Sequence, residues 1–177
     1  MKNLLFFLFA ASAAVSCNNQ IPYFEAKVQP VNEEKYEYPY TSDRPFNNWE
    51  IGDEKNIVLV LNSLKAYQDG KIATSIENFA DVVTLEFDNY HFKGNKDRAM
   101  QLFTRKRNNL QSLDIQIENC QSLTSRDTKD EWVSIWYKQK WTSKSGKTDS
   151  LFCMEDLKIE NGKIAVLDQK TRRYPKN

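Results

Sequence analysis

The sequence is poor in the residue types on which most metal and cofactor chemistry depends. Its 177 residues include one histidine, three cysteines and five glycines. No group of His, Cys and Asp residues has the spacing of metal ligands, and neither a phosphate-binding glycine loop nor a serine nucleophile elbow is present. We therefore expect no structural metal and no cofactor. We interpret the single histidine, His91, as a surface or strand residue.

An excess of charge of one sign is also missing. The chain has 25 Lys and Arg residues against 24 Asp and Glu residues. One of the 25, Lys2, lies in a segment that we predict to be removed, which leaves 24 of each sign. Nucleic-acid affinity rests largely on neutralisation of phosphates by a basic excess. We therefore do not expect a nucleic-acid partner.

Long hydrophobic runs are confined to the first residues. The segment MKNLLFFLFAASAAVSC combines Lys2, an apolar stretch and small residues, which is the pattern of a secretory signal peptide and is short for a membrane span. Residues 14–16, before Cys17, resemble the lipobox of bacterial lipoproteins. The resemblance implies cleavage after residue 16 and acylation of Cys17 by fatty acids such as palmitate. An ordinary signal peptide followed by an unrelated cysteine is the alternative.

The leader sets the expected division and location of the chain. We predict a signal peptide over residues 1–16, a lipidated cysteine and tether over 17–48, and one domain over 49–177. The tether holds four of the five prolines and shows neither helical nor alternating periodicity. Its aromatic residues leave open whether part of it packs on the domain. We expect lipid anchoring in the bacterial cell envelope, at the outer membrane facing the periplasm.

Hydrophobic periodicity predicts helices first and a meander of strands afterwards. A helix is predicted from Asp53 to Asp69, a short one follows, and a third begins near a capping Asn95. A strand, a turn and a short strand fill residues 81–94. Alternating runs then cover residues 113–125, 131–143, 148–160 and 163–171, with turn residues between them. This order indicates an α+β fold.

The order of elements and the ENGKI turn before the last strand resemble the nuclear transport factor 2-like superfamily, and within it the SnoaL-like branch. The resemblance covers residues 49–171. It implies a cone, in which a curved antiparallel sheet wraps around about three N-terminal helices and a pocket opens at the wide end.

Strand alternation places one acid of the run SLFCMEDLKIE inside the domain. Glu155 shares its face with apolar residues, whereas Asp156 faces the other side. Burial raises the pKa of a carboxyl group toward values useful for proton transfer. In SnoaL-like cyclases an acid–base aspartate lies about seven residues before the turn glycine, and here that position is Glu155. The predicted pocket residues are Tyr137, Gln139, Cys153, Glu155 and Leu157.

The opposite face of the meander is unusually apolar. Its predicted interface residues are Trp132, Trp136, Phe152 and Met154. A homodimer or an envelope partner, a covering tether and a second core layer are the three explanations. Sequential strand pairing would place Cys120 and Cys153 about 10 Å apart, too far for a disulfide. We therefore predict two free thiols.

Two functions remain open from the sequence. The first, which the sequence favours, is a lipid-anchored, non-catalytic binding or assembly module with a cone-shaped pocket. The alternative is a cofactor-free isomerase, dehydratase or cyclase that acts on a small apolar substrate, with Glu155 as general acid or base. Proton-transfer sites also need a polar partner that stabilises developing charge, and the sequence does not name one.

Overall fold

A computed structural model describes residues 37–173 of the chain. The predicted signal peptide, Cys17 and most of the tether lie outside the described residues. Contacts divide the chain into one unit ending at Thr41 and a second from Ser42 to Asn177. The last residues of the predicted tether therefore belong to the second unit, where the buried Asn48 side chain donates a hydrogen bond to Asp127 (2.7 Å).

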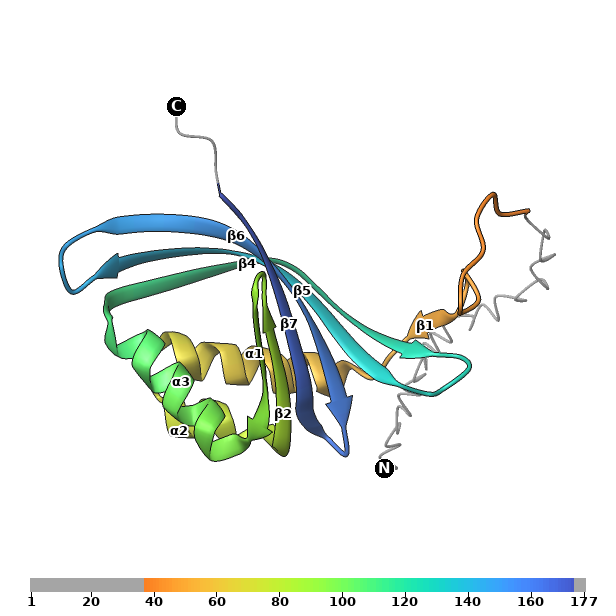
Figure 1. The fold of residues 1–177 in the computed structure, drawn as a ribbon, viewed down its shortest axis with the longest axis horizontal. Helices are drawn as coiled ribbons and strands as arrows, with labels where there is room; N and C mark the ends of the chain where they lie inside the picture. Colours follow the sequence, from red (N-terminus) through yellow and green to blue (C-terminus); the bar gives the residue numbers. More distant parts are fainter. Residues whose placement is uncertain (1–36, 174–177) are drawn as a thin grey trace, which may run out of the picture. The chain divides into compact units, whose positions relative to one another are not determined.

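The described residues of the second unit, 42–173, contain three helices and seven strands (Figure 1). In chain order they are β1 (Trp49–Ile51), α1 (Glu54–Gln68), α2 (Ile72–Glu77), β2 (Phe79–Phe87), β3 (Tyr90–Asn95), α3 (Lys96–Asn108), β4 (Leu110–Ser125), β5 (Glu131–Ser143), β6 (Thr148–Glu160) and β7 (Lys163–Arg173). No helix within residues 37–173 is long and apolar enough to cross a membrane.

Local signals set the helix ends. The Asp53 carboxylate accepts a hydrogen bond from the Lys55 backbone N–H (2.8 Å) and caps α1. The Asn95 side chain accepts one from the Arg98 N–H (3.0 Å), which confirms the predicted cap of α3. These bonds satisfy backbone donors that have no partner inside the helix.

One sheet contains all the described strands, in the order β1-β4-β5-β6-β7-β2-β3. The meander β4 to β7 is antiparallel, as predicted, and its last hairpin turns at Asn161 and Gly162, both at positive φ. The pairing of β2 with β7 is parallel, a detail that the prediction of a curved antiparallel sheet did not include. No hairpin joins these two strands, so local turn geometry does not fix their relative direction.

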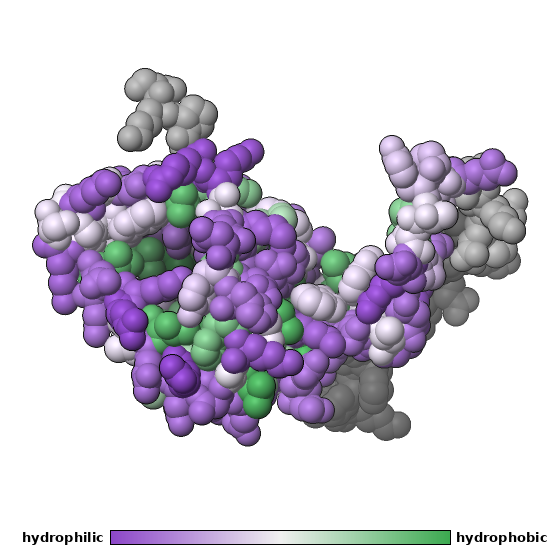
Figure 2. Space-filling model, in the orientation of Figure 1, coloured by the Kyte–Doolittle hydropathy of each residue, from purple (hydrophilic) through white to green (hydrophobic). Residues whose placement is uncertain are grey.

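The curved sheet wraps around the three helices, and the core lies between them (Figure 1). Irregular register in β4, between Leu110 and Ser112 and between Ile117 and Asn119, accompanies the bend. Buried side chains of all three helices and of β2, β5, β6 and β7 form one hydrophobic cluster. Figure 2 shows a mostly hydrophilic surface. It is hollowed between the helices and the hairpin that joins β5 to β6, and apolar residues are visible in the hollow.

Candidate functional site

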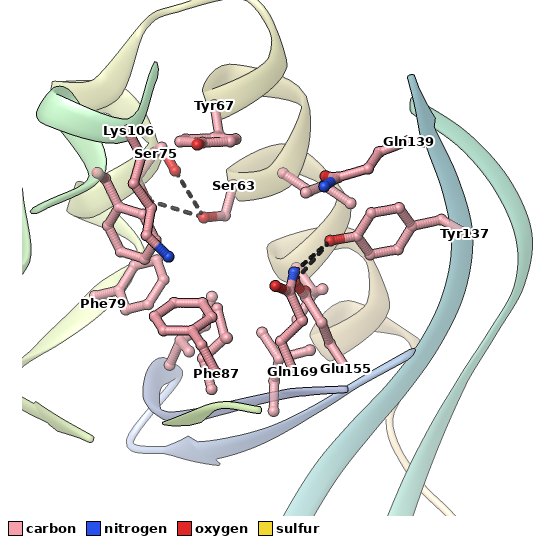
Figure 3. Close-up of a pocket in the computed structure, with 16 residues that line it drawn as sticks. Ser63, Tyr67, Ser75, Phe79, Phe87, Lys106, Tyr137, Gln139, Glu155 and Gln169 are labelled. Atoms are coloured by element: carbon pink, nitrogen blue, oxygen red, sulfur yellow. Dashed lines mark hydrogen bonds between the residues drawn. The ribbon is translucent and has the colours of Figure 1, made fainter. Parts of the chain in front are cut away.

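A cavity of about 140 Å³ lies between the helices and the concave face of the sheet. An engineered apolar cavity of about 150 Å³ holds one benzene molecule, so this space suits a ligand body of roughly that size. Eight of its sixteen lining residues are apolar, and the eight polar ones are labelled in Figure 3. The polar lining residues are Ser63, Tyr67, Ser75, Lys106, Tyr137, Gln139, Glu155 and Gln169.

Three of these side chains form a closed hydrogen-bonded triangle (Figure 3). The Tyr137 hydroxyl donates to Oε1 of Glu155 at 2.7 Å. The Gln169 amide donates to the same Oε1 at 2.7 Å and to the Tyr137 hydroxyl at 3.0 Å. The phenolic hydrogen is thus used by Glu155, the Gln169 amide reaches both oxygens from one side, and the three side chains hold one another in place.

Strand register brings the triangle together. Glu155 on β6 lies directly opposite Gln169 on β7. On the other side of β6, Tyr137 of β5 lies opposite Cys153, one inward position away from Glu155. Neighbouring strands lie about 4.8 Å apart, and a tyrosine reaches its diagonal neighbour at that spacing. The triangle is therefore built on sheet residues that cannot shift independently.

Glu155 combines burial with one unoccupied oxygen. Its residue is 5% exposed, which confirms the predicted inward position. Burial raises the pKa of its carboxyl group, while the bonds from Tyr137 and Gln169 and the charge of Lys106 act in the opposite direction. Both hydrogen bonds arrive at Oε1, and Oε2 has no protein partner among residues 37–173. That oxygen remains available to a molecule in the cavity that Glu155 lines.

A cation lies across the cavity from this carboxyl group (Figure 3). Lys106 of α3 places its ammonium 3.7 Å from the centre of the Phe87 ring, a cation–π contact. Burial lowers the pKa of Lys106, and the negative charge of Glu155 raises it in part. Within the described part of the chain, Lys106 has neither an ion pair nor a hydrogen bond from its ammonium.

The helix wall adds a pair of hydroxyl groups. Ser63 of α1 donates to the backbone carbonyl of Ser75 at 3.1 Å, and the two Oγ atoms lie 3.2 Å apart. Both serines are buried. Their bonds join α1 to α2 and place oxygen acceptors on the wall formed by these helices.

Four of the five predicted pocket residues line the cavity, and the fifth does not. Tyr137, Gln139, Glu155 and Leu157 line the cavity. Cys153 is fully buried in the hydrophobic core and does not line it, because neighbouring core side chains cover that position. Burial raises the pKa of its thiol to about 12, so it is a packing residue. Both Cys120 and Cys153 are free thiols, as predicted.

Sequence reasoning missed five of the eight polar lining residues, and two of the five, Gln169 and Lys106, act directly on Glu155. Gln169 continues the inward alternation from Leu167 along β7, so the period could have shown its direction but not its partner. Lys106 shares the apolar stripe of α3 with Ala99 and Phe103, and a lysine at such a position is the signal that could have indicated it.

The predicted interface residues lie on the convex face of the sheet. Trp132, Trp136, Phe152 and Met154 are all half-buried. Part of this cover comes from the sheet itself, since the Arg172 guanidinium lies 5.0 Å from the centre of the Phe152 ring. Trp136 and Met154 are direct cross-strand neighbours. Ser134 and Asp156 lie opposite each other between the levels of Trp132 and Trp136, so polar residues interrupt the apolar part of this face.

The remaining titratable candidates do not converge on the cavity. His91 on β3 is exposed, and its Nδ1 lies 2.6 Å from the carboxylate of Glu86. Within residues 37–173, no three His, Cys, Asp or Glu side chains gather closely enough to hold a metal ion. The chemistry that the described site can offer is that of Glu155, Lys106 and their neutral partners.

Comparisons with known proteins identify the fold. No protein-family model matches the sequence, and no curated protein matches it. An LEH-like epoxide hydrolase from M. tuberculosis superposes with a TM-score of 0.56 at 13% identity, over 67% of this chain and 83% of the other. A Jannaschia sp. CCS1 protein assigned as a SnoaL-like polyketide cyclase gives 0.55 at 15% identity, over 74% and 91%.

A third solved structure supports the same assignment. An NTF2-like protein of unknown function from Cytophaga hutchinsonii gives a TM-score of 0.50 at 15% identity, over 70% of this chain and 92% of the other. The chain therefore has the nuclear transport factor 2-like fold that its order of elements predicted. At these identities the similarity shows the fold alone, and function has to be argued from the site.

Proposed function

We propose that this protein is a cofactor-free enzyme that moves a proton within a small apolar substrate, as an isomerase, dehydratase or cyclase does. Glu155 is the general acid or base. The observation that carries the proposal is a buried carboxyl group that is fixed through Oε1 and leaves Oε2 free beside a cavity of benzene size.

The triangle gives Glu155 the two properties that proton transfer needs. Its orientation is fixed by Tyr137 and Gln169, so the reacting oxygen is positioned before the substrate arrives. Its raised pKa brings the carboxyl group toward the range in which it can both accept and return a proton. A buried carboxylate with only structural partners would have both oxygens occupied, and here one is not.

Lys106, the cation across the cavity, is the partner that we propose for stabilising developing negative charge. The sequence alone did not identify such a partner. When a base removes a proton from carbon, negative charge develops on the substrate, and a fixed positive charge nearby lowers the energy of that state. Among residues 37–173, Lys106 is the one cationic residue that lines the cavity. The likeness to an epoxide hydrolase and to a protein assigned as a polyketide cyclase also favours catalysis over the binding-module hypothesis.

Proton exchange on a small ketone tests the role of Glu155. Cyclohexanone in deuterated buffer exchanges its α-protons slowly, and NMR follows the loss of their signal. We expect the protein to accelerate this exchange and Glu155→Gln to reduce the acceleration by about 100-fold, the lower end of the usual acid–base contribution.

The matched control is Glu160→Gln, an exposed glutamate at the end of the same strand. It should retain the exchange rate of the original protein. If Glu155→Gln exchanges as fast as Glu160→Gln, Glu155 is not the acid–base group and the proposal is wrong.

A further inference from the structure

We propose that the natural substrate is a small monocarboxylate whose apolar body fills the cavity and whose carboxylate pairs with Lys106 at the mouth. This inference rests on the proposed function for the identity of the reacting end. It adds the chemical class of the substrate and a specificity-determining residue.

Lys106 lies where three hollows meet. It lines the cavity of about 140 Å³, a groove of about 530 Å³ beside β2, β3 and α3, and a hollow of about 270 Å³ near Trp141. Phe87, Phe103 and Gln169 are shared by the first two spaces, and Tyr67 and Gln139 by the first and third. Among the residues lining these spaces, Lys106 alone is common to all three. Lys106 therefore lies where the cavity adjoins both of the other spaces.

No acidic side chain within residues 37–173 forms an ion pair with Lys106. Glu155 is the one acidic residue that lines the cavity, and it forms no ion pair with Lys106. Asp88 lines the adjoining groove, but its carboxylate accepts bonds from the backbone N–H and the hydroxyl of Thr171 (3.0 and 2.6 Å). A partly buried ammonium without an acceptor carries a desolvation cost, and an anionic ligand group at this place would offset it.

The two ends of the cavity require different ligand groups. Near Glu155 the ligand must present carbon-bound hydrogen or a neutral group, because a second negative charge there would be repelled. At the other end, the Phe87 ring gives an apolar surface, and the Lys106 ammonium beside it is a positive group. A monoanion with a compact apolar body satisfies both ends at once, whereas a dianion would bring a second negative charge toward Glu155 and a cation would be repelled by Lys106.

Benzoate and benzamide are the matched probes. They share the ring that the cavity volume accommodates, and only benzoate carries a charge. We expect isothermal titration calorimetry to show benzoate binding about tenfold more tightly than benzamide, as one charge-assisted hydrogen bond gives. In Lys106→Met, which keeps the aliphatic stem, this preference should disappear while benzamide affinity stays unchanged.

The control variant is Arg105→Gln. Arg105 precedes Lys106 in α3. It lines the groove beside β2, β3 and α3 but not the cavity, so its replacement should leave the benzoate preference intact. Thermal unfolding of each variant verifies that it is folded. Equal affinities for the two probes in the original protein, absence of binding by either probe, or a preference that survives Lys106→Met would each overturn the proposal. An equal loss of the benzoate preference in Arg105→Gln and in Lys106→Met would also overturn the proposal.

This test is independent of catalysis. Binding is measured without turnover, so failure of the ketone exchange experiment would leave a Lys106-dependent benzoate preference standing. Cyclohexanone carries no charge, so failure of the benzoate experiment would in turn leave a Glu155-dependent exchange standing.

Discussion

Replacement of a buried charged residue usually destabilises a protein. At alkaline pH, replacement of Glu155 by glutamine should instead stabilise this one. The amide oxygen of the new side chain can occupy the place of Oε1 and accept from Tyr137 and Gln169, while its NH₂ takes the place of the unpaired Oε2. The variant therefore keeps both hydrogen bonds and the shape of the site. The variant also avoids the free-energy cost of burying a carboxylate at a position that is only 5% exposed.

The size of the effect follows from proton linkage. The folded pKa of Glu155 is raised above its unfolded value of about 4.3, so the folded protein retains a proton that the unfolded chain releases. The stabilisation from that proton is fully present below the unfolded pKa and is lost as pH rises through the folded pKa. Over this interval the free energy of unfolding should fall by up to about 1.4 kcal/mol per pH unit relative to Glu155→Gln.

Urea unfolding measures this difference directly. The free energies of unfolding of both proteins are determined by tryptophan fluorescence from about pH 4 to about pH 9, where linear extrapolation applies. All other titrating groups are common to both proteins and largely cancel in the difference. A difference that is independent of pH, or one that favours the original protein more as pH rises, would refute the assignment of Glu155 as a buried carboxyl group with a raised pKa.

Two further predictions concern the partners of the site and the predicted anchor. Tyr137→Phe removes the hydroxyl that donates to Glu155 and accepts from Gln169, and urea unfolding should show a loss of about 2 kcal/mol, greatest where Glu155 is ionised; a loss below about 0.5 kcal/mol would contradict the triangle as a stabilising unit. When the protein is expressed in a bacterium, we expect it in the membrane fraction and Cys17→Ala in the soluble fraction, because acyl chains on that thiol are the predicted anchor. A variant that stays in the membrane fraction would contradict lipidation at Cys17.

Short-range patterns were sufficient to predict much of the fold. The cap at Asn95 and the Asn161-Gly162 hairpin are local features, and each depends only on residues a few positions apart. The direction of Glu155 follows from the two-residue period of a strand and from its apolar neighbours in the sequence. The order of helices and strands follows from the same periodicities.

Long-range geometry decided the rest. The parallel pairing of β2 with β7 joins segments far apart in the chain, and no local signal specifies it. The same holds for the register that sets Gln169 opposite Glu155, and for the helix packing that places Lys106 across the cavity. The sequence by itself determined that an acid would lie inside the sheet, because alternation is local. Only the tertiary structure decided that the acid has fixed partners, a free oxygen and a facing cation, because those contacts depend on how separate elements pack.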